Sequence, residues 1–188
     1  MWRWLVSRFD VRRLVFVDES GMHTSMDRLR SRAPKGERAY GKVPRNRGKN
    51  TTLIASMGLW GMGESMAIKG ATDSEVFEVY VEHFLAPTLH EGQEVVVLDG
   101  LGAHRPKRIR ELIEAMRGAE LVFLASYSPD LNPIEEAFSK IKNTLRKVGA
   151  RTHEALVEAM GGALREVTPW DAAGWFDHCG YEVEVQYL

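Results

Sequence analysis

Two short, unbroken apolar runs, each ending in an aspartate, place the strongest constraint on the fold of this chain. Residues 14–17 (LVFV) lead into Asp18, and residues 94–99 (EVVVLD) end at Asp99. Runs of this length without alternating polar residues are typical of strands buried on both faces of a sheet. Because open α/β sheets bind ligands beyond the carboxyl ends of such strands, both aspartates are predicted to lie at a binding site.

The segments around these two strands predict a mixed sheet covered by helices. Strand-like runs at 51–60 and 64–69 flank Gly61-Met62-Gly63 and indicate a β-hairpin. A further strand is expected at 121–124. Helices are expected over residues 74–85, 106–117, 133–148, 152–167 and 169–178. This order of elements is typical of the α/β class, and 188 residues with 44% hydrophobic content suffice for one domain with a core.

Composition excludes several classes of protein. The single cysteine, Cys179, cannot form an internal disulfide and disfavours a zinc site built on cysteine. No apolar run is long enough to span a bilayer, so no membrane role is expected. The start, MWRWLVSRFD, lacks the apolar stretch of an export signal. These features predict a cytoplasmic protein.

A strongly basic segment interrupts the first half of the chain. Residues 28–49 contain nine basic residues and one acid, Glu37, so the segment carries +8 while the whole chain carries −1. Such a concentrated charge beside an acidic body indicates contact with a polyanion, and an ordinary solvated loop is the alternative. The basic residues are Arg28, Arg30, Arg32, Lys35, Arg38, Lys42, Arg45, Arg47 and Lys49.

A third carboxylate is predicted at the start of the helix over 133–148. Asn132 lies at the N-cap position and Glu135 at the third helical position, so an ordinary capping box is one interpretation. Helical phase places Glu135 at the border of the apolar stripe and Glu136 nearly opposite it, facing solvent. A border carboxylate can reach the end of the sheet, which favours Glu135 as a partner of the two aspartates.

Three carboxylates in one small volume favour a metal site. Neighbouring strands lie about 4.8 Å apart, so Asp18 and Asp99 face the same space if their strands are adjacent. Two anions that close raise each other's pKa unless cations lie between them, and hard ions such as Mg²⁺ prefer oxygen ligands. A single aspartate at a strand end is more often a turn former.

Three sequence blocks resemble the catalytic motifs of DDE transposases: LVFVDES, VVVLDGLGAH and YSPDLNPIEEAFSKIK. They are most similar to the bacterial insertion-sequence branch of the mariner superfamily, whose short spacing between the second and third acids matches the 36 positions from Asp99 to Glu135. The resemblance runs from about Leu14 to Tyr181. The string SPDLNPIE, after a strand and opening a helix, is its most specific part.

The resemblance implies a fold, a reaction and a set of ligands. The fold is a ribonuclease-H-like five-stranded sheet with strands 1–3 antiparallel, strands 4 and 5 parallel, and the first and fourth strands adjacent. Asp18, Asp99 and Glu135 would bind two Mg²⁺ or Mn²⁺ ions for cleavage and transfer of DNA strands at transposon ends. The implied domain spans residues 14–181, after a lead-in at 1–13 and before a tail at 182–188.

The resemblance also implies partners. These are transposon-end and target DNA, a second copy of the chain, and a helix-turn-helix module supplied upstream or by another reading frame, in a bacterial, nucleoid-associated setting. The basic segment would contact DNA or the partner subunit, and His104 and Asn132 would support the active site. The tryptophans are expected in the core or an interface.

Some residues depart from the family pattern. Gly100 stands where asparagine usually follows the second aspartate, and Ala125-Ser126 stand where two prolines are common. No helix-turn-helix module fits before Leu14. An alternative is therefore a non-catalytic truncated remnant that dimerises or regulates a full-length transposase. A separate nuclease of the same fold is a third interpretation, which the SPDLNPIEE block disfavours.

Overall fold

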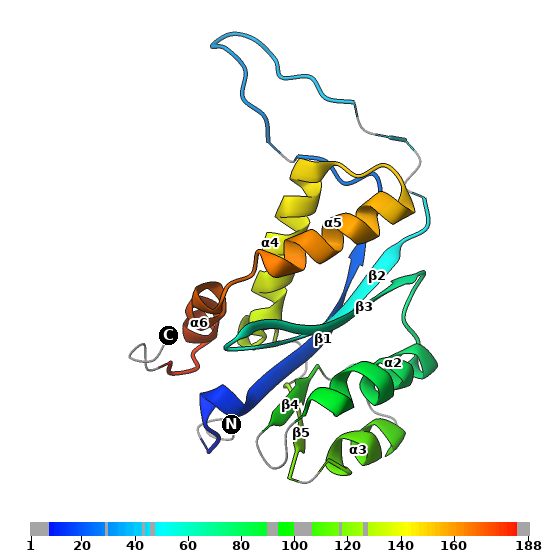
Figure 1. Ribbon diagram of the computed structural model, residues 1–188. Coiled ribbons are helices and arrows are strands. Elements are labelled where there is room, and N and C mark those ends of the chain that lie inside the picture. The colour runs from blue at the N-terminus through cyan, green and yellow to red at the C-terminus, as the bar shows by residue number, and fades with distance from the viewer. Residues whose placement is uncertain are drawn as a thin grey trace.

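Five strands form one mixed sheet in the order β3-β2-β1-β4-β5 (Figure 1). The computed structural model describes residues 8–28, 30–42, 44–45, 48–89, 94–99, 107–116, 118–125 and 128–183. The strands β1 to β3 pair antiparallel, and β4 lies parallel to both β1 and β5. This arrangement confirms the predicted α/β, ribonuclease-H-like fold, including the adjacency of the first and fourth strands. Their bounds are β1 Leu14–Met22, β2 Thr51–Gly58, β3 Gly61–Lys69, β4 Val95–Leu98 and β5 Glu120–Phe123.

Helices cover both faces of this sheet (Figure 1). One face packs against α4 (Pro133–Val148), α5 (His153–Arg165) and α6 (Pro169–His178). The other packs against α2 (Ser74–Tyr80), the π-helical turn η2 (Val81–Leu85) and α3 (Lys107–Glu114). Short 3₁₀ turns complete the described elements: η1 (Val11–Arg13), η3 (Ala86–Thr88) and η5 (Pro129–Leu131). Among the described residues, no helix combines the length and hydrophobicity that crossing a bilayer demands.

Alternation along β1 decides which residues face α4. Phe16 belongs to the core under α4, α5 and α6, whereas Val15 and Val17 belong to the core under α2 and α3. Because successive side chains of a strand point to opposite faces, Asp18 lies on the α4 side with Phe16. Phe16 also makes edge-to-face contacts with Phe176 and Tyr181, both at ring distances of 5.3 Å, which pack β1 against the end of α6.

Two predicted boundaries are wrong in instructive ways. The first strand does not end at Val17 but continues to Met22, because its second half pairs with β2 from Asp18↔Ala55 to Met22↔Thr51. The hairpin turn is not Gly61-Met62-Gly63 but Leu59–Trp60, and β3 already begins at Gly61, whose φ is 103°. A two-residue turn suits the right-handed twist of paired strands, and glycine tolerates the positive φ beside it.

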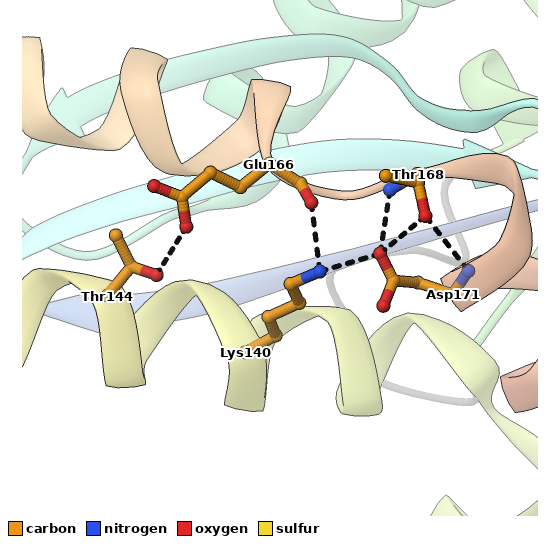
Figure 2. A network of polar contacts seen from close by, with 5 residues as sticks. All are labelled: Lys140, Thr144, Glu166, Thr168 and Asp171. Carbon is orange, nitrogen blue, oxygen red and sulfur yellow. Dashed lines mark hydrogen bonds and ion pairs between the residues drawn. The ribbon is translucent and has the colours of Figure 1, made fainter.

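A polar network fixes α4 relative to α6 (Figure 2). The Lys140 ammonium donates to the Glu166 carbonyl at 2.9 Å and to Asp171 Oδ2 at 2.6 Å. Asp171 and Thr168 form the capping box of α6. Burial raises the pKa of Asp171, but the hydrogen bonds from Lys140 and Thr168 outweigh it, so this pKa lies below its ordinary value. The orientation of α4 is thereby held by more than apolar packing.

Candidate functional site

The sheet brings Asp18 and Asp99 to neighbouring positions. The last paired residues of β1 and β4 are Val17 and Leu98, and each aspartate is the next residue along its strand. Val97 and Phe16 both belong to the core under α4, and alternation places the two aspartates on that same face. The prediction that Asp18 lies at the end of its strand is therefore wrong. Asp18 lies within β1, one residue beyond the point where the parallel pairing with β4 stops.

The carboxylate of Asp18 is buried and held from two sides. The residue is 5% exposed. Its Oδ1 accepts the backbone N–H of Glu19 at 2.7 Å, and its Oδ2 accepts the Asn132 side-chain amide at 2.9 Å. Burial raises the pKa of Asp18 to about 7 despite the Glu19 N–H, and the negative charges of Glu135, Asp99 and Glu19 raise it further. The charges of all three predicted acids thus act within one region.

Asn132 joins α4 to β1. It lies at the N-cap position of α4, as predicted, but its side chain makes no capping hydrogen bond. The capping-box interpretation of Asn132 and Glu135 is therefore wrong. Instead, the amide donates to Asp18, 114 positions earlier in the chain. Asn132 is 4% exposed, and its Oδ1 is buried without a hydrogen-bond partner in the described part of the chain. The side-chain amide therefore donates to the buried carboxylate, while the backbone carbonyl of Asn132 accepts the N–H of Glu135 at the start of α4.

The two glutamates of the first turn of α4 face different surroundings. Glu135 is exposed, and its charge acts on Asp18. The Glu136 side chain is 42% exposed, in line with the helical phase, and its Oε1 lies 3.4 Å from Nδ1 of His178 on α6. The phase of α4 alone carries no information about α6, which packs beside it. Of the two, Glu135 is the carboxylate on the side of Asp18.

The donor set suits a hard divalent cation. Carboxylate oxygens are the ligands that Mg²⁺ and Mn²⁺ prefer, and a cation near Asp18 would offset the repulsion that raises its pKa. As the side chains are placed, no three acidic, histidine or cysteine side chains in the described parts of the chain lie together closely enough to hold an ion. Ligation by all three acids therefore requires rotation of Asp99 and Glu135 toward the buried Asp18.

The described basic residues of the segment over 28–49 are all exposed, and this segment extends beyond the ends of α4 and α5 (Figure 1). Arg47 lies outside the described residues, as do His104 and Gly100. Both ends of the segment are held by residues that sequence reasoning missed. Arg151 donates to the carbonyls of Thr24 and Met26 at 3.1 and 3.0 Å, and Nδ1 of His153 lies 3.1 Å from Thr51 Oγ1.

Two tryptophans lie outside the core, so for them only the interface alternative of the prediction is left. Trp60 in the β2–β3 turn is 50% exposed, and Trp170 in the first turn of α6 is 63% exposed. Trp175 is partly buried against the core under α4. The hydrophobicity of an indole does not by itself show which tryptophans a fold covers.

Comparison with solved structures supports the same fold. The pre-cleavage Mos1 transpososome aligns with a TM-score of 0.67 and 18% identity, over 97% of this chain and 61% of that chain. The Mos1 transposase paired-end complex with left transposon end gives 0.61 and 17%, over 95% and 60%. The Mos1 transposase catalytic domain with Raltegravir and Mg gives 0.61 and 15%, over 97% and 92%. The chain thus spans about three fifths of the longer transposase chains.

Comparison of sequences identifies the family. No curated protein shows significant similarity to the chain. Residues 13–157 match the family described as DDE superfamily endonuclease. This match covers more than half of the chain and includes Asp18, Asp99 and Glu135. The chain belongs to the DDE superfamily of endonucleases.

Proposed function

We propose that this chain is the catalytic domain of a DDE transposase that cleaves DNA at transposon ends and transfers the cut strands, using two divalent metal ions. The observation that carries the proposal is the buried Asp18 carboxylate, on which the charges of Asp99 and Glu135 converge. The similar Mos1 structures include a pre-cleavage transpososome, a complex with a transposon end and a catalytic domain with Mg. The sequence blocks favour the bacterial insertion-sequence branch of the mariner superfamily.

In this proposal the three acids differ in how firmly the fold holds their side chains. When bound, two divalent ions supply activation of the attacking oxygen and stabilisation of the leaving oxygen. Asp18 is the fixed ligand, because both of its oxygens accept hydrogen bonds from groups on β1 and at the start of α4. Asp99 and Glu135 are less buried and turn toward it. No covalent protein intermediate is needed.

The reaction is tested by incubating the purified chain with duplex DNA that carries the ends of its own element. We expect strand nicking that requires Mg²⁺ or Mn²⁺ and stops with EDTA. A folded chain that binds end DNA but cuts it with neither ion would contradict the proposal and support the alternative of a non-catalytic remnant. The DNA upstream of the coding frame provides a second check, because a helix-turn-helix encoded there would be a source of an end-binding module.

Replacing Asn132 by alanine is expected to weaken Mn²⁺ binding about 10–100-fold, because groups that orient a metal ligand typically contribute this much. The variant leaves Asp18 Oδ2 without its amide donor while all three acids remain. Calorimetric titration of the folded variant with Mn²⁺ measures the effect without reference to cleavage. An unchanged Mn²⁺ affinity would show that the Asn132 contact plays no part in ion binding.

The basic segment is proposed to contact DNA, with contact to a partner subunit as the alternative. If it binds phosphates, the logarithm of the affinity for DNA falls with the logarithm of salt concentration, by about 0.9 per neutralised phosphate. Replacing Arg30, Arg32 and Arg38 by glutamine is expected to reduce that slope by about 2 to 3. A slope that stays the same would exclude phosphate contacts by these residues, and sedimentation analysis of the same variant would then test the dimer role.

A further inference from the structure

A cavity of about 500 Å³ lies on the face of the sheet opposite Asp18. Its lining includes Val15 at the start of β1, Glu94 just before β4, and Thr88 and Leu89 after η2. Val15 belongs to the core under α2 and α3, whereas Asp18 faces α4. The cavity is thus separate from the carboxylate site, and nothing in the proposed strand cleavage uses it.

Glu94 is a buried acid with one unsatisfied carboxyl oxygen. The residue is 7% exposed, and its Oε2 is buried with no hydrogen-bond partner among the residues that the structure describes. Its backbone carbonyl, by contrast, accepts the N–H of Glu120 at 3.1 Å as part of the β4–β5 pairing. Buried polar groups without partners are rare in folded proteins. A donor group that enters the cavity would provide the Glu94 carboxyl with a partner.

Two hydroxyl groups of the lining also offer acceptor oxygens. The hydroxyl of Ser56 donates to the Glu64 carbonyl at 3.3 Å, and that of Thr88 donates to the Leu85 carbonyl at 2.7 Å. With their protons used in this way, both hydroxyl oxygens remain acceptors. The exposed Glu64 adds a second carboxylate to the lining. The complement of such a lining is a group with several donors and no acceptor, which describes a guanidinium.

The apolar part of the lining suits the rest of an arginine side chain. The Trp60 indole lies over Gly58, where an added Cβ would come within 2.4 Å of the ring, and the residue is 50% exposed. Guanidinium groups stack on such rings, and they are more weakly hydrated than an ammonium. Val15, Met62 and Leu89 offer apolar contact for the methylene stem. The volume far exceeds that of a bare metal ion.

From these observations we propose that the cavity is a binding site for an arginine side chain of a polypeptide, with its guanidinium on Glu94 and its plane against Trp60. The probe for a test is Nα-acetyl-arginine methylamide, which reproduces an arginine within a chain. The citrulline analogue is the matched control, because it has nearly the same shape without the charge. Binding is followed by the indole N–H signal of Trp60 in the ¹H–¹⁵N spectrum, identified by its loss in Trp60→Phe.

We expect the arginine probe to cause a saturable shift of that signal with a Kd of about 1 mM. The citrulline analogue should bind the unaltered chain at least about tenfold more weakly. The arginine probe should bind Glu94→Gln at least about tenfold more weakly than it binds the unaltered chain. Equal binding of both probes, or equal binding of the arginine probe by Glu94→Gln, would overturn the proposal. Asp99→Asn should bind the arginine probe as the unaltered chain does, so this test is independent of strand cleavage.

Discussion

Replacing Asp99 by asparagine is expected to reduce DNA strand cleavage by about a thousandfold or more. The change removes one anionic oxygen ligand from the proposed metal site, and a loss of about 4 kcal/mol of transition-state stabilisation corresponds to a factor of about 10³ in rate. The assay is nicking of end-containing duplex DNA with Mn²⁺. Asp99 lies beyond the last β1–β4 pair, so the sheet should remain intact, and circular dichroism checks that it does.

The adjacent glutamates of α4 provide a matched pair for the same assay. Glu135→Gln should abolish cleavage as Asp99→Asn does, whereas Glu136→Gln should retain most of the activity. Both changes remove one negative charge from the same helical turn, so a general effect on DNA affinity or on α4 would alter both variants alike. Loss of activity in Glu136→Gln but not in Glu135→Gln would show that the third acid has been assigned to the wrong residue.

In metal-free buffer, replacing Asp18 by asparagine is expected to stabilise the protein at neutral pH. The folded-state pKa of Asp18 is raised from 3.8 to about 7, so the unfolded chain releases this proton at lower pH than the folded chain. The stability of the protein therefore falls as pH rises from about 4 to about 7, by up to about 4 kcal/mol in total. Asparagine cannot ionise, but it loses one of two accepted hydrogen bonds, worth about 1 kcal/mol. The expected net gain at pH 8 is about 2–3 kcal/mol.

Urea unfolding at pH 4 and pH 8 in EDTA measures this difference. The free energy of unfolding of Asp18→Asn should exceed that of the unaltered chain by more at pH 8 than at pH 4. Saturating Mn²⁺ should make the unaltered chain the more stable of the two at pH 8, because an ion bound only by the folded state adds stability. A variant destabilised equally at both pH values would show that the Asp18 carboxylate is paired within the fold. Asp18 would then be structural rather than part of an ion site.

The sequence by itself was sufficient for the elements whose limits are set by local chemistry. The helix α4 begins at Pro133 and ends at Val148 as predicted, because proline is favoured in the first turn and Gly149 takes the left-handed conformation after the last. The unbroken run over 95–98 was recognisable as a buried strand for the same local reason. The motif blocks then indicated the strand order, which apolar patterns alone left open.

The tertiary structure decided what depends on contacts between distant segments. Pairing with β2 extends β1 past Asp18 to Met22, and α6 draws Glu136 toward His178. Asn132 was predicted as a helix cap and, from the resemblance, as active-site support; its amide donates to a carboxylate 114 positions away and does not cap the helix. The hydrophobic pattern of a single segment cannot predict these contacts, because each depends on the register and packing between elements. Local propensity therefore determined where strands and helices form, and packing determined what their polar side chains meet.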